Sequence, residues 1–298
     1  MTVTDRFNIG PENVFLNTEW DPDRSRQHLE LGVIVAGMLS LPLEIETTIL
    51  DFLAEDDKGH SALKTCSLVC HAFLPICRKH IFGSIVLNLN DHNMEFPFTL
   101  HPFERLLRET PEIADYIRKL ELGLDYNIRF ADSAGLSIQE SLKQISRLEF
   151  ITIPCNNGRR LDWSNNPFRP ALLHLLHLPT LTHCEMSHID NFVISDLIPC
   201  VNLKYLDIGF STTVAAENSF SGVLPEHSIQ PNEFVARSGT SGAIIKLCTA
   251  CRPDGQPIID FGSLSEITLE IQDHDEGEAS QELLRRCQVL TNVNIFCK

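Results

Sequence analysis

Apolar residues recur at helical spacing between residues 40 and 82. Leu41 precedes Pro42, and because a residue before proline avoids the helical region while proline suits the first helical position, we expect a helix to begin at Pro42. One apolar stripe follows along this helix, made of Ile45, Ile49, Phe52 and Leu53. The acidic run at residues 55–57 and then Gly59 end it.

Two further short helices are expected in the same segment. Ser61 can cap the second helix, whose apolar face carries Leu63, Cys66, Cys70 and Phe73, with Val69 beside them. Pro75 ends that helix and allows a third turn from Cys77 to Phe82. So short a helical unit buries little surface, and we expect it to need a partner or the rest of the chain for stability.

A different pattern follows after residue 90, with apolar residues at positions one, four and six of a six-residue unit. The unit occurs six times, beginning at Ile117, Leu148, Leu181, Leu203, Leu264 and Leu290. Each unit follows an apolar or helix-like stretch, and the starts are separated by 31, 33, 22, 61 and 26 residues. This alternation predicts strands that are connected by helices. The longest interval contains residues 211–242, whose Ser, Gly, Asn and Pro content indicates a surface loop insertion.

The helical segment resembles an F-box in the order and spacing of its parts. These parts are LPLEIETTILDFL (residues 41–53), LKTCSLVCHAF (63–73) and LPICRKHIFGSIVL (74–87), although Phe73 stands where the F-box often has Trp. The resemblance implies that the segment docks on a Skp-type linker protein, which joins it to a cullin. The linker-binding residues that it implies are Leu41, Pro42, Glu44, Ile45, Ile49, Leu53, Leu63, Val69, Cys70 and Phe73. Since apolar residues at helical spacing also form internal cores, part of this set supports the helices themselves.

The six-residue units resemble irregular leucine-rich repeats, whose period is about 20–29 residues. The Asn or Cys that usually closes the turn after each repeat strand is mostly missing, with only Asp125 and Asn156 near that place. The fold that we expect is α/β, a short three-helix F-box followed by an irregular leucine-rich-repeat-like solenoid. Residues 1–39 would be an N-terminal tail, 40–89 the F-box and 90–298 the target-binding repeats.

This architecture resembles the fungal-type F-box substrate receptors of Skp–cullin–F-box ubiquitin ligases. The resemblance implies a receptor that is not an enzyme and needs no cofactor, and that contributes by holding a protein target near the transfer machinery. The alternative is a leucine-rich-repeat interaction scaffold with no role in ubiquitin transfer.

Positions three and five of each unit project from the face opposite the buried one, which in leucine-rich repeats is the concave, target-binding face. The candidate target-binding residues are Lys119, Glu121, Phe150, Thr152, His183, Glu185, Tyr205, Asp207, Glu266, Thr268, Asn292 and Asn294. Acids outnumber bases in this set, so we expect a basic or polar target segment.

The charge and hydropathy of the chain disfavour further classes of function. The 298 residues carry 24 Lys plus Arg against 40 Asp plus Glu, a formal charge of −16 that disfavours binding to nucleic acid. The longest apolar stretch, Leu31–Leu39, is far shorter than the roughly 20 residues that span a membrane. The first ten residues lack the pattern of a secretory signal, so we expect a cytoplasmic or nuclear protein whose ten cysteines are reduced thiols.

Three groups of residues could carry metal or thiol chemistry. Cys66, Cys70, Cys77 and His80 could be written as a zinc set, but the first two cysteines lie on an apolar helix face. Cys248 and Cys251 form a single CTAC, which we interpret as structural, with redox or metal use as the alternative. His174 and His177 share one helix face without the glutamate of HExxH.

Two further sequence features bear on chemistry. The acidic run at residues 273–278 is misordered for an EF-hand, and we interpret it as a solvated loop. The sequence contains no GxSxG, GxxxxGK[ST], GxGxxG or HExxH motif. We therefore expect neither a catalytic site nor a metal site.

Overall fold

The structure is a computed structural model that describes residues 42–56, 60–69, 71–88, 100–123, 133–154, 160–210, 212–215 and 222–297. Within these residues the fold is mixed α/β with a mostly parallel sheet, which agrees with the predicted class. The chain divides into two compact units, the first ending at Ile81 and the second beginning at Phe82. The predicted tail at residues 1–39 lies outside the described residues.

Three helices make up the described part of the first unit. They are α2 (Leu43–Asp56), α3 (Ser61–Ser67) and α4 (Phe73–Ile81). The start of α2 agrees with the prediction at Pro42 to within one residue. Ser61 was predicted to cap α3, but it is the first helical residue, and the cap is His60 in a left-handed conformation with φ of 52°. Pro75 does not end a helix as predicted, because it lies in the first turn of α4, where no intrahelical N–H is needed.

A small apolar cluster holds these helices together. Leu50 from α2, Leu63 from α3 and Cys77 from α4 are each at most 3% exposed. The side chain of His80 on α4 forms a 2.6 Å hydrogen bond with Asp51 Oδ1 on α2. Each helix therefore contributes one buried residue to the same core.

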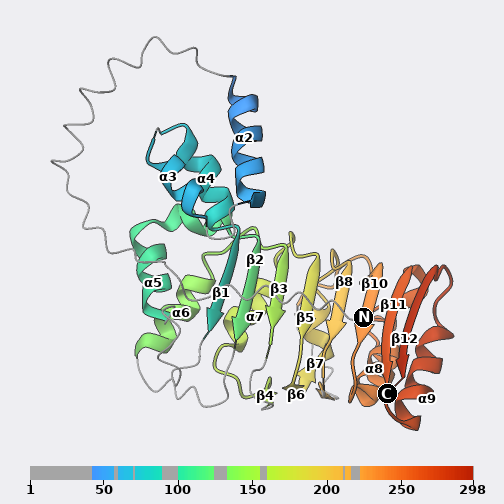
Figure 1. The fold of residues 1–298 in the computed structure, drawn as a ribbon. Helices are drawn as coiled ribbons and strands as arrows, with labels where there is room; N and C mark the ends of the chain where they lie inside the picture. Colours follow the sequence, from blue (N-terminus) through green and yellow to red (C-terminus); the bar gives the residue numbers. More distant parts are fainter. Residues whose placement is uncertain are drawn as a thin grey trace, which may run out of the picture. The chain divides into compact units, whose positions relative to one another are not determined.

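The second unit is built on one eight-stranded parallel sheet. Its strands are β1 (Ser84–Asn88), β2 (Lys119–Gly123), β3 (Phe150–Ile153), β5 (His183–Met186), β8 (Tyr205–Ile208), β10 (Glu233–Ala236), β11 (Glu266–Ile271) and β12 (Asn292–Cys297). Their order in the sheet follows their order in the chain, and Figure 1 shows them side by side. All six predicted strands are confirmed as members of this sheet.

Helices and short strands connect the strands of this sheet. The helices are α5 (Leu100–Glu109), η1 (Pro111–Tyr116), α6 (Ser133–Leu142), α7 (Arg169–Leu176), η3 (Ile194–Leu197), α8 (Ser241–Thr249), η4 (Phe261–Ser263) and α9 (His274–Leu284). Two short parallel pairs join β4 (Leu161–Asp162) to β6 (Ile189–Asp190) and β7 (Phe192–Val193) to β9 (Val214–Ala215). In Figure 1, α7 and α8 lie behind the sheet.

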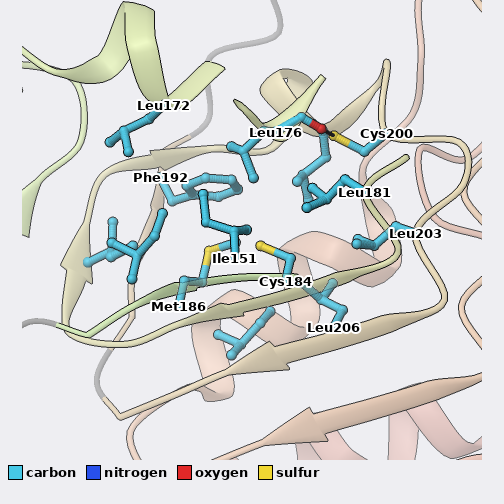
Figure 2. Packing of buried hydrophobic residues seen from close by; sticks show 14 of the residues in the cluster. Ile151, Leu172, Leu176, Leu181, Cys184, Met186, Phe192, Cys200, Leu203 and Leu206 are labelled. Carbon is cyan, nitrogen blue, oxygen red and sulfur yellow. Dashed lines mark hydrogen bonds between the residues drawn. The ribbon is translucent and has the colours of Figure 1, made fainter. Parts of the chain in front are cut away.

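Alternate strand residues pack against these helices in one continuous core. Positions one, four and six of the first five predicted units are all at most 3% exposed. Figure 2 shows how Cys184 and Met186 of β5 share this core with Leu172 of α7. The thiol of Cys200 donates a 3.2 Å hydrogen bond to the Leu176 carbonyl, which closes the end of α7. The period-two pattern of the sequence thus determines which face of the sheet is buried.

The sixth unit differs, because β12 is the edge strand of the sheet. Its residues Asn292–Cys297 are all exposed. Val293 and Ile295, predicted to be buried, are each 47% exposed, because no described strand follows β12 to extend the sheet and its core.

Two segments belong to different elements from those predicted. Residues 211–242 were predicted to be a surface loop, but residues 233–236 form β10 between β8 and β11, with Phe234 completely buried. Residues 84–88 were assigned to the F-box, but they form β1, which pairs with β2 in the second unit.

The acidic run at residues 273–278 is not a solvated loop. It forms the start of α9, where the Asp273 side chain accepts a hydrogen bond from the Glu276 amide. Glu276 is 3% exposed and accepts hydrogen bonds from the amides of Gly239 and Gln272. Asp273 caps the helix N-terminus, and the acids of the first turn interact favourably with the positive end of the helix dipole, which explains their clustering.

Candidate functional site

The face of the sheet opposite the core carries the predicted target-binding residues in aligned rows. We call this surface the polar face. The first row consists of Lys119, Phe150, His183, Tyr205, Glu233, Glu266 and Asn292, which are register partners on β2 to β12. The second row, two residues further along each strand, consists of Glu121, Thr152, Glu185, Asp207, Val235, Thr268 and Asn294. All twelve predicted residues therefore lie on one face of the sheet, where Asp207 is only 3% exposed.

Aromatic rings stack across the middle of the first row. The centroids of Phe150 and His183 are 3.7 Å apart with an interplanar angle of 15°, and those of His183 and Tyr205 are 5.5 Å apart. The ammonium of Lys119 lies 4.7 Å from the centroid of Phe150 at the end of the stack. Because the ring faces cover one another, the row presents ring edges away from the sheet.

The second row is acidic, and its acids differ in their partners. The guanidinium of Arg237, at the end of β10, donates to both carboxylate oxygens of Asp207, with the shortest distance 2.7 Å. Glu185 accepts a 3.4 Å hydrogen bond from the Thr152 hydroxyl and forms no ion pair with a described residue. Glu121 is exposed and likewise has no ion pair within the described residues.

Burial and like charges shift the pKa values on this face. Burial, and then the charge of Asp207, raise the pKa of Glu185 above its usual value. Burial also raises the pKa of Asp207, against the opposing effect of the Arg237 hydrogen bonds. Burial, and then the charge of Lys119, lower the pKa of His183, which keeps this ring neutral at pH 7. The second row thus holds carboxylates whose charge the protein itself compensates only in part.

Three charged residues of this face were missed from the sequence. Glu233 lies on β10, the strand mistaken for a loop. Arg237 and Glu270 follow the second row by two positions, one residue beyond the six-residue unit. A seventh position in the unit would have found Glu270 but not Arg237, because no unit was predicted at β10. With them, the described strands place six acids and two bases on the polar face.

A second candidate surface is an exposed apolar stripe on α2. Ile45, Ile49 and Phe52 are 47%, 51% and 65% exposed, and their spacing puts them on one side of the helix. Leu68 and Val69, after α3, are 84% and 69% exposed. Large apolar side chains clustered on a surface are typical of a protein interface.

The predicted linker-binding residues divide between this surface and the internal cluster. Pro42, Glu44, Ile45, Ile49 and Val69 are exposed. Leu63 is buried and Leu53 and Phe73 are partly buried against it, so these three support the helices. Leu41 and Cys70 lie outside the described residues. Leu43, Phe52 and Leu68, which were absent from the prediction, are exposed apolar residues of the same unit.

The histidines and cysteines that were considered for metal or thiol chemistry lie in surroundings that do not favour it. The ring of His177 forms a 2.8 Å hydrogen bond with the Asp196 carbonyl, and that of His174 a 3.3 Å bond with the Ile145 carbonyl. Burial raises the pKa of Cys248 to about 11, the opposite of what a reactive thiol requires. Within the described residues, no group of three or more His, Cys, Asp or Glu side chains is placed to bind a metal ion.

No helix in the described ranges has the length and apolar character needed to cross a membrane. A scan against protein-family models, a search of curated proteins and a search of solved structures each find no match for this chain.

Proposed function

We propose that this chain is a substrate receptor of a Skp–cullin–F-box ubiquitin ligase. In this proposal the first unit is a three-helix F-box that docks on a Skp-type linker, and the second is an irregular leucine-rich-repeat-like solenoid that holds a protein target on its polar face. The receptor performs no bond chemistry and acts by proximity. A cullin bound through the linker and a location in the cytoplasm or nucleus belong to the same proposal.

The observation that carries the proposal is the exposed stripe of Ile45, Ile49 and Phe52. The internal cluster of the first unit already uses Leu50 and Leu63, so the stripe does not serve its core. Three exposed apolar side chains on one helix lower the free energy of the protein when a partner covers them, because about 25 cal/mol is gained per Å² of apolar surface removed from water.

The sheet topology supports the solenoid part of the proposal. Successive parallel strands lie next to each other from β1 to β12 without a reversal of order. A doubly wound α/β fold reverses its strand order and binds ligands at the switch point, whereas stacked repeats add each strand to the same edge. The uncovered side of such a stack is an extended surface suited to a protein segment.

Co-expression with a Skp-type linker tests this proposal. The wild-type chain is expected to elute from size-exclusion chromatography as a 1:1 complex, measured by light scattering. Ile49→Asp should abolish the complex because it places a charge in the apolar contact. Val289→Asp is the matched control, since Val289 is an exposed valine of the second unit, and it should leave the complex unchanged.

Failure of the folded wild-type chain to form the complex would contradict the receptor function. It would favour the alternative, an interaction scaffold that uses the polar face without ubiquitin transfer. Equal loss of the complex in both variants would also contradict it, because the effect would not depend on the stripe.

A further inference from the structure

Two of the three acids in the second row, Glu121 and Glu185, form no ion pair with a described residue, and they are separated by two strands. Glu121 on β2 and Glu185 on β5 are both register partners of Thr152 on β3. Neighbouring strands lie about 4.8 Å apart, so the two carboxylates stand roughly 9.6 Å apart across the strands. Asp207, the next acid in the row, is already paired with Arg237.

This spacing selects the backbone conformation of a bound segment. In a polyproline II segment, residues i and i+3 point to the same side and lie about 9.3 Å apart, since the rise is about 3.1 Å per residue with three residues per turn. In a β-strand, residues i and i+3 point to opposite sides. At this separation of three residues, the polyproline II conformation presents two side chains to Glu121 and Glu185 at nearly the right distance, and the β-strand does not.

The aromatic row lies beside the acids and suits the same conformation. Phe150 and His183 are register partners in the first row, two residues before Thr152 and Glu185 on their strands, and so lie roughly 7 Å along the strands from the acidic row. Their stacked rings present edges, which carry partial positive charge and attract carbonyl oxygens. The carbonyls of a polyproline II segment are free of internal hydrogen bonds and can meet these edges, while its proline rings can pack on Phe150.

We propose that the polar face binds a protein segment in the polyproline II conformation, with arginines at positions i and i+3 that pair with Glu121 and Glu185. Arginine is favoured over lysine because its planar guanidinium forms bidentate bonds with a carboxylate. This inference deepens the proposed function, on which it rests, by naming the class of target that the receptor captures.

Fluorescence anisotropy with the full chain and a labelled peptide containing Arg-Pro-Pro-Arg tests the inference. We expect saturable binding that Glu121→Gln and Glu185→Gln each weaken by about tenfold or more. Glu278→Gln removes the same charge from an exposed position on α9, outside the polar face, and should change the affinity less than twofold. A peptide with Arg-Pro-Pro-Pro-Arg, which keeps the charge but lengthens the spacing, should bind at least tenfold more weakly.

Two results would overturn the inference. Equal affinity for both peptides, or equal weakening by Glu278→Gln, would mean that net charge alone attracts the peptide without a defined spacing. The absence of binding in a chain that still forms the linker complex would refute the target class and leave the receptor function standing. Binding of the peptide without a linker complex would support the target class and contradict the receptor function.

Discussion

At the scale of single residues, Glu185 and Asp207 face different environments although they are neighbours in one row. Arg237 donates to both oxygens of Asp207, whereas Glu185 accepts a hydrogen bond from the Thr152 hydroxyl and forms no ion pair with a described residue. Burial and the charge of Asp207 raise the pKa of Glu185, so its ionised form costs stability at neutral pH. A cation of the bound target would compensate this cost when it pairs with Glu185.

Glu185→Gln should therefore stabilise the free protein at pH 7. The folded state binds the Glu185 proton more tightly than the unfolded state does, so stability falls as pH rises through the window above pH 4.5. We expect the variant to unfold about 1–2 °C higher at pH 7 and at the same temperature as wild type at pH 4, measured by calorimetry. Arg237→Gln is the opposite control, because it leaves Asp207 buried without its cation and should lower the unfolding temperature. A lower unfolding temperature for Glu185→Gln at pH 7 would contradict the argument.

The positions of single residues in the strands also explain which site residues could be predicted from the sequence. Alternation along each strand predicted the faces of Glu121 and Glu185 correctly, because a period of two allows one outward face. Arg237 was missed because it follows β10, which was predicted to be part of a loop, and its pairing with Asp207 depends on strand neighbours that sequence spacing does not contain. Exposed residues such as Phe52 could be seen as apolar, but not as excluded from the internal cluster.

At the scale of elements, β10 shows what a repeat pattern misses. Its strand places Phe234 and Ala236 at positions four and six, but Pro231 at position one and a polar segment before it obscured the pattern. Residues 84–88 were not predicted to be a strand for another reason, because the resemblance had assigned them to the F-box. The strongly periodic segments were predictable from the sequence, whereas β10 can be recognised as a strand only from its pairing with β8 and β11.

Phe234→Ala tests whether β10 is an integral strand of the sheet. Phe234 is completely buried and its ring centroid lies 5.5 Å from that of Phe261. The truncation should lower the free energy of unfolding by about 3–5 kcal/mol, measured by urea denaturation. Ile295→Ala on the edge strand β12 should cost less than about 1 kcal/mol, because Ile295 is 47% exposed. Similar costs for the two variants would contradict the central position of β10.

At the scale of the whole molecule, the two units have separate cores of very different size. The cluster of the first unit contains three buried residues among those described, whereas the second unit has one continuous core along its sheet. A unit with so small a core is marginally stable by itself. In the proposed receptor, linker binding covers the first unit and adds to its stability by mass action.

Leu63→Ala tests this division of labour between the units. Leu63 is completely buried, and its truncation should cost about 2–5 kcal/mol, as much as the first unit can have in total. We expect the variant to lose the 1:1 complex with the linker while its affinity for the Arg-Pro-Pro-Arg peptide stays within twofold of wild type. Leu68→Ala, at an exposed leucine of the same unit, should leave the helices folded by circular dichroism. Loss of peptide binding in Leu63→Ala would mean that the polar face depends on the first unit, and the receptor would then work as one cooperative body.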